Sequence, residues 1–154
     1  MHPRAIELID ILHLVPHPEG GYFREVFRSI QTVQPSDSRP TRAALTTIYF
    51  LLPAGAYSRW HQVLSDEVWH FYEGAPLELL CDEQCWVLGP VTSNSEQALV
   101  QIVPAGAWQA ARSLGEYTLV GCTVGPGFDF ADFTLREGNP FAELPPGHAL
   151  GADN

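Results

Sequence analysis

Short runs of alternating apolar and polar residues, separated by Gly and Pro turns, fill the chain from about residue 20 to residue 135. This alternation is typical of strands, whose side chains point to opposite faces of a sheet at every second residue. The pattern predicts roughly eight to ten short strands, the spacing expected of an antiparallel sandwich or barrel. The predicted strands are 22–29, 46–52, a short strand carrying His61, 67–72, 76–81, 83–89, 98–103, 108–111, 117–124 and 128–135. The alternation in the last strand breaks at Ala131-Asp132, which indicates a bulge or a turn.

A different periodicity opens the chain. Apolar residues at helical spacing (Ile6, Ile9 and Leu12, flanked by Leu8 and Ile11) follow Pro3, and Pro16 ends the pattern. We predict a helix at residues 1–15 that lies against the barrel, because so short a helix needs tertiary packing. The chain then forms one domain over residues 1–137, with the barrel at 20–137 and a tail at 138–154. Residues 31–42 are predicted to be a loop because they are rich in Pro, Ser and other turn-forming residues.

Charge limits the partners. The chain has 18 acidic and 8 basic residues, all of the latter arginine, for a net charge of −10. Nucleic acids and anionic membranes both need a basic surface, so neither is expected as a partner. No apolar run approaches the ~18 residues that would cross a bilayer. The three cysteines, Cys81, Cys85 and Cys122, are an odd number, and we expect a cytoplasmic protein with reduced thiols.

The most informative stretch is 55–74. His61 and Val63 share one face of the first predicted strand there, and Glu67, Trp69 and Phe71 share one face of the next. A histidine and a carboxylate at facing ends of neighbouring strands can converge inside a sandwich or barrel. Such a pair can hold a metal, move a proton, or satisfy each other's hydrogen bonds.

Particular residues also resemble a known superfamily. Gly55, His61, Glu67 and Gly74 fit the first motif of the cupins, with Val63 in place of its second histidine. Residues 104–109 resemble the second motif, with Gln109 where the third histidine belongs. The segments 17–22, 66–72 and 125–130 are similar to the small single-domain cupin-5 family. The resemblance implies an all-β cupin jelly-roll barrel of antiparallel strands with a short N-terminal helix.

Metallocupins use three histidines and one glutamate, and two of these four positions are replaced here. Val63 has no donor atom, and the neutral amide of Gln109 binds transition metals weakly. We therefore expect no metal and no other cofactor. The alternative is a degenerate ligand set of His61, Glu67, His70 and Gln109, although a regular strand places His70 on the face opposite Glu67.

The predicted function is small-molecule binding with proton transfer. His61 and Glu67 are the predicted catalytic residues of an isomerase or epimerase acting on a carbohydrate-like or other small polar substrate, with His61 as base and Glu67 orienting it. Metal-free cupins such as the sugar-nucleotide epimerases use a pocket histidine in this way. The residues expected to bind the ligand are Arg24, Trp69, Phe71, Trp108 and Gln109. A non-catalytic ligand-binding cupin and a metal-dependent oxygenase remain alternatives.

Two further expectations concern the N-terminal part. His13 and His17 are given no ligand role, because a histidine near a helix C-terminus is already favourably placed beside the helix dipole. The helix and strand 22–29 are expected to join two copies in a two-fold homodimer, since an open sheet edge is a liability unless it is covered.

Overall fold

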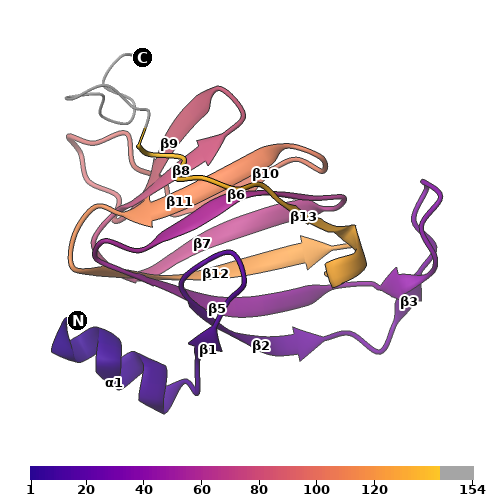
Figure 1. Ribbon diagram of the computed structural model, residues 1–154, viewed down its shortest axis with the longest axis horizontal. Coiled ribbons are helices and arrows are strands. Elements are labelled where there is room, and N and C mark those ends of the chain that lie inside the picture. The colour runs from indigo at the N-terminus through magenta and orange to yellow at the C-terminus, as the bar shows by residue number, and fades with distance from the viewer. Residues whose placement is uncertain (143–154) are drawn as a thin grey trace.

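The structure is a computed structural model that describes residues 1–142 (Figure 1). One short α-helix precedes the strands, which make up most of the regular secondary structure. The elements are α1 (Pro3–Ile11), β1 (Val15–Pro16), β2 (Tyr22–Arg28), β3 (Thr32–Val33), β4 (Arg42–Ala43), β5 (Thr46–Pro53), β6 (Tyr57–Val63), β7 (Asp66–Gly74), β8 (Leu77–Cys81), β9 (Gln84–Leu88), β10 (Val100–Val103), β11 (Trp108–Ser113), β12 (Tyr117–Gly125), the 3-10 helix η1 (Phe130–Asp132) and β13 (Phe133–Leu135).

Two antiparallel sheets face each other. The larger has six strands in the order β1-β2-β5-β12-β7-β10, and the smaller has five in the order β13-β6-β11-β8-β9. Strands β3 and β4 form a separate ribbon at one end of the molecule, at the right of Figure 1. The two-sheet arrangement confirms the predicted all-β cupin fold with its short N-terminal helix.

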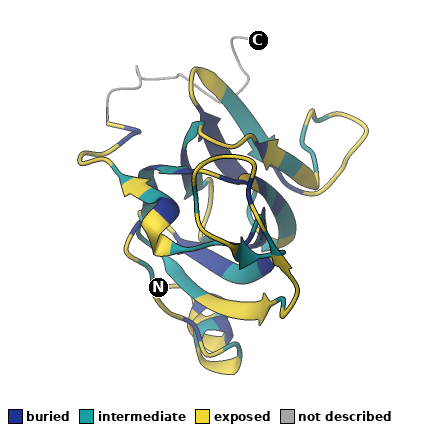
Figure 2. Ribbon diagram, turned by 90° about the vertical axis from the view of Figure 1, so that its right-hand side faces the viewer, coloured by how far each residue is buried: buried dark blue, intermediate teal, exposed yellow. Residues whose placement is uncertain are grey.

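The core lies between the two sheets. It contains Phe50, Trp69, Leu79 and Val120, each with no exposed surface, and it forms the dark interior of Figure 2. Helix α1 covers the other face of the larger sheet, where Ala5 and Leu8 meet Leu51 and Leu119. Burial of this stripe stabilises a helix that is too short to persist alone, as predicted.

Several predicted boundaries were wrong. The helix stops at Ile11 rather than near residue 15, because His13 adopts a left-handed φ of 55° and the chain re-emerges as β1. Residues 31–42 are not wholly loop, since Thr32–Val33 pairs with Arg42–Ala43. The strand expected at 98–103 begins at Val100.

At the C-terminal end of the domain, the irregularity at Ala131-Asp132 is one turn of 3-10 helix, so strand 128–135 shortens to β13. Of the predicted tail 138–154, residues 143–154 lie outside the described part of the chain. The described part of that tail is anchored, because Phe141 is 8% exposed and packs beside Tyr57 and Trp60.

The homodimer stays a prediction. Apolar side chains of the two expected contact elements lie at the surface, namely Ile6, Ile11, Val26 and Phe27. Burying such side chains against a second copy would stabilise the pair. Light scattering at micromolar concentration is expected to give the mass of two chains, and the mass of one chain would contradict the prediction.

Candidate functional site

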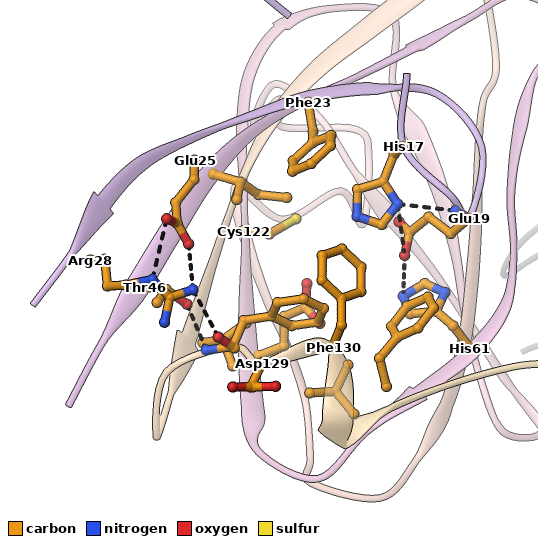
Figure 3. Close-up of a pocket in the computed structure, with 16 residues that line it drawn as sticks. His17, Glu19, Phe23, Glu25, Arg28, Thr46, His61, Cys122, Asp129 and Phe130 are labelled. Atoms are coloured by element: carbon orange, nitrogen blue, oxygen red, sulfur yellow. Dashed lines mark hydrogen bonds and ion pairs between the residues drawn. The ribbon is translucent and has the colours of Figure 1, made fainter. Parts of the chain in front are cut away.

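A cavity of about 410 Å³ opens between the two sheets. Eight segments line it: β2, β5, β7 and β12 of the larger sheet, β6 and β13 of the smaller, the turn between β1 and β2, and residues 128–130. Figure 3 shows polar groups gathered in two places, with aromatic rings between them. Concave, largely apolar cavities of this size with a few polar groups are the general form of small-molecule sites.

The turn between β1 and β2 carries His17 and Glu19 into the cavity. Gly20 and Gly21 have left-handed φ angles of 112° and 74°, and a Cβ at Gly20 would overlap the carbonyl oxygen of Tyr57 in β6. Only glycine allows this backbone to lie so close to β6. The Arg59 amide donates to the Glu19 carbonyl oxygen over 2.7 Å and fixes the approach. Glu19 therefore reaches His61, although 42 positions separate them in the sequence.

Glu19 and His61 share one proton. The Nδ1 atom of His61 lies 2.7 Å from the carbonyl oxygen of Arg59, which can only accept, so Nδ1 carries a hydrogen. The Nε2 atom lies 3.1 Å from Oε2 of Glu19. A proton must sit between these two atoms, either on a neutral carboxyl group or on an imidazolium ring. The pair is electrically neutral in both cases.

Burial decides where this proton rests. Removal from water raises the pKa of Glu19 to about 8, against the opposing effects of a hydrogen bond from Ser58 and the charge of Arg59. Burial also lowers the pKa of His61, although the charge of Glu67 and the Arg59 carbonyl oppose this. Both directions favour a protonated Glu19 beside a neutral His61 near neutral pH.

His17 is held in the opposite tautomer. Its Nδ1 accepts the Glu19 backbone N–H over 3.0 Å, so the hydrogen of the neutral ring sits on Nε2. Figure 3 shows this second nitrogen on the cavity side of the ring. Burial, and then the nearby His61, lower the pKa of His17 to about 3, so the ring stays neutral under ordinary conditions. His17 was expected beside the C-terminus of the helix, but α1 ends at Ile11 and the turn places His17 in the cavity lining.

Glu67 enters from β7 and belongs to a second hydrogen-bonded chain. Its Oε1 accepts from Gln109 Nε2 over 2.9 Å, and Gln109 Oε1 accepts from the Trp69 indole over 2.9 Å. Burial raises the pKa of Glu67, opposed by the charge of His61. The buried thiol of Cys122 lies beside it, and burial raises the pKa of that thiol well above its usual range. Glu67 and His61 thus line one cavity, while Glu19, not Glu67, contacts the His61 ring.

The mouth of the cavity carries a separate ion pair. Arg28 Nη2 lies 2.7 Å from Oε1 of Glu25 and also donates to the Phe128 carbonyl oxygen over 2.9 Å. A register shift between Glu25 and Phe27 brings both Glu25 and Arg28 to the cavity side of β2. Strict alternation puts Glu25 and Arg28 on opposite faces of a strand, so sequence spacing alone does not bring the two side chains together.

The five residues expected to bind the ligand lie elsewhere, and the described cavity lining includes none of them. Trp69 and Gln109 form the hydrogen-bonded chain behind Glu67, and Phe71 packs against the core. Trp108 lies under the guanidinium group of Arg136, with 4.9 Å from the guanidinium carbon to the ring centre. The guanidinium of Arg24 lies over Tyr49.

The residues present do not fit the metal centre that the cupin motifs imply. Val63 brings no donor, and both polar atoms of the Gln109 amide are already used by Glu67 and Trp69. The ring of His70 stacks on Tyr72, with 6.4 Å between centroids, and does not line the cavity. Across residues 1–142, no group of three or more His, Cys, Asp and Glu side chains is arranged to hold a metal ion.

The metal content of the purified protein tests whether these residues hold a metal ion. The protein purified without added metal is expected to carry well under one equivalent of iron, manganese, zinc or nickel per chain, because so few donors converge. Elemental analysis measures this directly. A full equivalent that disappears in the His61→Ala variant would contradict it.

The buried carboxyl group of Glu19 also predicts a pH dependence of stability. Its pKa rises from 4.5 to about 8 on folding, so between these values the native state holds a proton that the unfolded state has lost. The free energy of unfolding contributed by Glu19 therefore falls as pH rises through this window. Urea unfolding of Glu19→Gln is expected to show a smaller loss of stability between neutral pH and pH about 8 than the wild type. Glu83→Gln, on an exposed turn, is the matched control, and a slope unchanged in Glu19→Gln would contradict the assignment.

Comparison with known proteins decides the family. The model of the Cupin_5 family, described as Cupin superfamily (DUF985), matches residues 6–136. The chain belongs to the cupin-5 family. This cupin is similar to a hypothetical protein from Leishmania major, with 34% identity, 94% of this chain and 93% of that chain covered, and a TM-score of 0.80. It is also similar to a protein from Shewanella oneidensis, with 32% identity, coverage of 85% and 83%, and a TM-score of 0.77.

A third relative is an uncharacterized protein of Saccharomyces cerevisiae, 28% identical over 151 residues that cover 86% of this chain and 75% of the yeast protein. The family establishes the cupin fold of this chain. No helix in residues 1–142 of this cupin has the length and apolarity needed to cross a membrane.

Proposed function

We propose that this cupin is a metal-free enzyme of the isomerase or epimerase type, which moves a proton within a small organic substrate. The observation that carries the proposal is the 3.1 Å contact between Glu19 Oε2 and His61 Nε2, in a cavity of molecular size. The pair is buried, holds one proton and can take a second. A group whose pKa lies near neutral is the kind that general acid and base catalysis uses.

The proposed step balances in atoms and charge. A substrate C–H bond breaks next to a carbonyl group, the proton passes to the Glu19–His61 pair, and the electron pair moves to the carbonyl oxygen. The pair becomes singly positive and the substrate becomes an enolate, so the overall charge of the cavity is unchanged. Return of the proton to another carbon, or to the other face of the same carbon, completes an isomerisation or an epimerisation. Glu67, in the same cavity with a raised pKa, provides a second carboxyl group for this return.

The second candidate is a cupin that binds a ligand without reaction. The continuous chain from Trp69 through Gln109 to Glu67 supports it, because a fully hydrogen-bonded wall is suited to holding a ligand in one orientation. Both candidates use the same cavity. They differ only in whether a proton leaves the substrate.

Solvent deuterium separates the two. A small molecule recovered from the purified protein, or a carbonyl compound found to bind it, is incubated with the protein in D₂O and analysed by mass spectrometry and NMR. The enzyme reading predicts that deuterium enters a C–H position with the wild type and not with His61→Asn. Binding without any incorporation would contradict the proposed reaction and support the non-catalytic alternative.

A further inference from the structure

One buried polar group in the cavity has no role in the proposed proton transfer. The side chain of His17 is only 6% exposed, and its Nδ1 is occupied by the Glu19 amide. Its Nε2–H forms no hydrogen bond with any described residue, and Figure 3 shows it directed into the cavity. Because this donor is held in a fixed direction at the cavity surface, it is available to an acceptor atom of a ligand in the cavity.

The direction of this hydrogen bond identifies the ligand group. A neutral ring whose Nδ1 accepts can only donate from Nε2, so the ligand atom facing it must be an acceptor. A carbonyl oxygen is such an acceptor, and it accepts more strongly when it becomes an enolate oxygen. A neutral imidazole in this position polarises a carbonyl without transferring its own proton first.

The charges around the cavity argue against an anionic ligand. Four carboxyl groups line it, from Glu19, Glu25, Glu67 and Asp129. Among the described lining residues Arg28 is the only cation, and it is already paired with Glu25 and the Phe128 carbonyl oxygen. A carboxylate or phosphate would lose its hydration without gaining a free partner, which is strongly unfavourable in a buried site.

The apolar side chains that line the cavity make a ligand with many hydroxyl groups unfavourable. Between the two polar regions the lining is apolar, with Phe23, Ile48, Val63, Val124, Phe128 and Phe133. A sugar would leave several hydroxyl groups without partners against these side chains, at a cost for each one. A compact apolar ring system would instead bury its surface favourably.

We infer that the cavity takes an uncharged cyclic carbonyl compound, with the carbonyl oxygen accepting a hydrogen bond from His17 Nε2 and the ring lying between the phenylalanine side chains. This inference rests on the proposed function and narrows its substrate class. It separates the ligand from the sugar nucleotides used by metal-free cupin epimerases, which are anionic. It also makes His17 a catalytic residue, since it touches the oxygen on which charge develops.

Two variants of His17 isolate this hydrogen bond. In His17→Gln the side-chain amide nitrogen reaches the place of Nε2 and keeps a donor toward the cavity. In His17→Asn the shorter amide reaches only the place of Nδ1, so the contact with the Glu19 amide can persist while the donor is lost. Both variants lose the ring contacts with Phe23 and Phe50, so weaker ketone binding by His17→Asn, which can keep the Glu19 amide contact, than by His17→Gln reports the donor toward the cavity.

The test is a binding titration followed by NMR with two probes of one ring system. These are β-tetralone, an uncharged cyclic ketone, and the matched tetralin carboxylate, in which a carboxylate group replaces the ketone. Wild type and His17→Gln are expected to bind β-tetralone at millimolar concentration, and His17→Asn about 10-fold more weakly, the value of one hydrogen bond. The carboxylate is expected to bind at least ~10-fold more weakly than the ketone to the wild type.

Three outcomes would overturn the inference: no binding of the ketone, equal affinity of the two His17 variants for it, or a carboxylate that binds as tightly as the ketone. Its failure is distinct from failure of the proposed reaction. Deuterium incorporation into an anionic substrate would contradict this inference and leave proton transfer standing. Ketone binding that depends on the His17 donor, without deuterium incorporation, would support this inference and contradict the proposed proton transfer.

Discussion

The His61→Asn variant is expected to slow proton transfer in the cavity by roughly 10²–10⁴-fold, the usual contribution of a general acid or base. The asparagine amide nitrogen can still donate to the Arg59 carbonyl oxygen, as His61 Nδ1 does over 2.7 Å. What disappears is Nε2, the atom that shares a proton with Glu19. Ligand affinity is expected to change little, because the change removes a proton carrier rather than a wall of the cavity. The measurement is the rate of deuterium incorporation at saturating ligand.

Glu67→Gln is the matched control for this prediction. The new amide oxygen can accept from Gln109 as Glu67 Oε1 does, so the hydrogen-bonded chain is kept while the charge is lost. Because Glu67 does not contact the His61 ring, its effect on the first proton abstraction is expected to be smaller than that of His61→Asn. If both variants instead unfold at lower temperature and incorporate deuterium at the wild-type rate, His61 and Glu67 are structural and the assignment of the site is wrong.

Asp132→Ala is expected to lower the free energy of unfolding by about 3–5 kcal/mol, the usual cost of breaking a buried ion pair from one side. Asp132 is 4% exposed and lies in η1. Its Oδ1 is 2.7 Å from Arg42 Nη2, and its Oδ2 is 3.2 Å from Arg39 Nη1. Both arginine side chains are at most one-tenth exposed, and the variant leaves Arg42 without this carboxylate, while Arg39 keeps its contact with Asp37. Urea unfolding at neutral pH measures the change.

The control for this prediction is a surface pair. Arg4 lies 2.7 Å from Glu73, but both side chains are about one-third exposed. Arg4→Ala is expected to cost far less stability than Asp132→Ala, since water screens the pair. Equal losses in the two variants would show that burial of the Asp132 cluster contributes nothing. The cluster also ties residues 39–42 to the segment bearing Asp129 and Phe130, so Asp132→Ala is expected to weaken ligand binding as well.

Local patterns predicted the sheet architecture well and the cavity only in part. Alternation and Gly or Pro turns identified most strands, because a half-buried strand alternates apolar and polar residues along the sequence. His61 and Glu67 were placed in one cavity because the cupin spacing puts them on facing strands. The positions of Trp69 and Gln109 behind Glu67, rather than on the cavity surface, depend on packing that no local pattern encodes.

The residues that were missed come from irregular backbone. Glu19 and His17 arrive on a turn held by Gly20 and Gly21, and Arg28 reaches the cavity through a bulge. The Gly20-Gly21 pair directly after Glu19 was the available signal, since adjacent glycines often mark close backbone approach. The ion cluster of Asp132 joins residues about 90 positions apart, and no sequence spacing predicts such a pair.

Because the cavity is lined from both sheets and from the β1–β2 turn, a molecule that fills it must bridge parts of the chain that separate on unfolding. Its binding energy then adds directly to the stability of the native state. A ligand present at about 100 times its dissociation constant raises the free energy of unfolding by about 2.7 kcal/mol. For a domain of this size that corresponds to a rise of several degrees in melting temperature. A thermal-shift screen of metabolites can therefore find the natural ligand before any reaction is known.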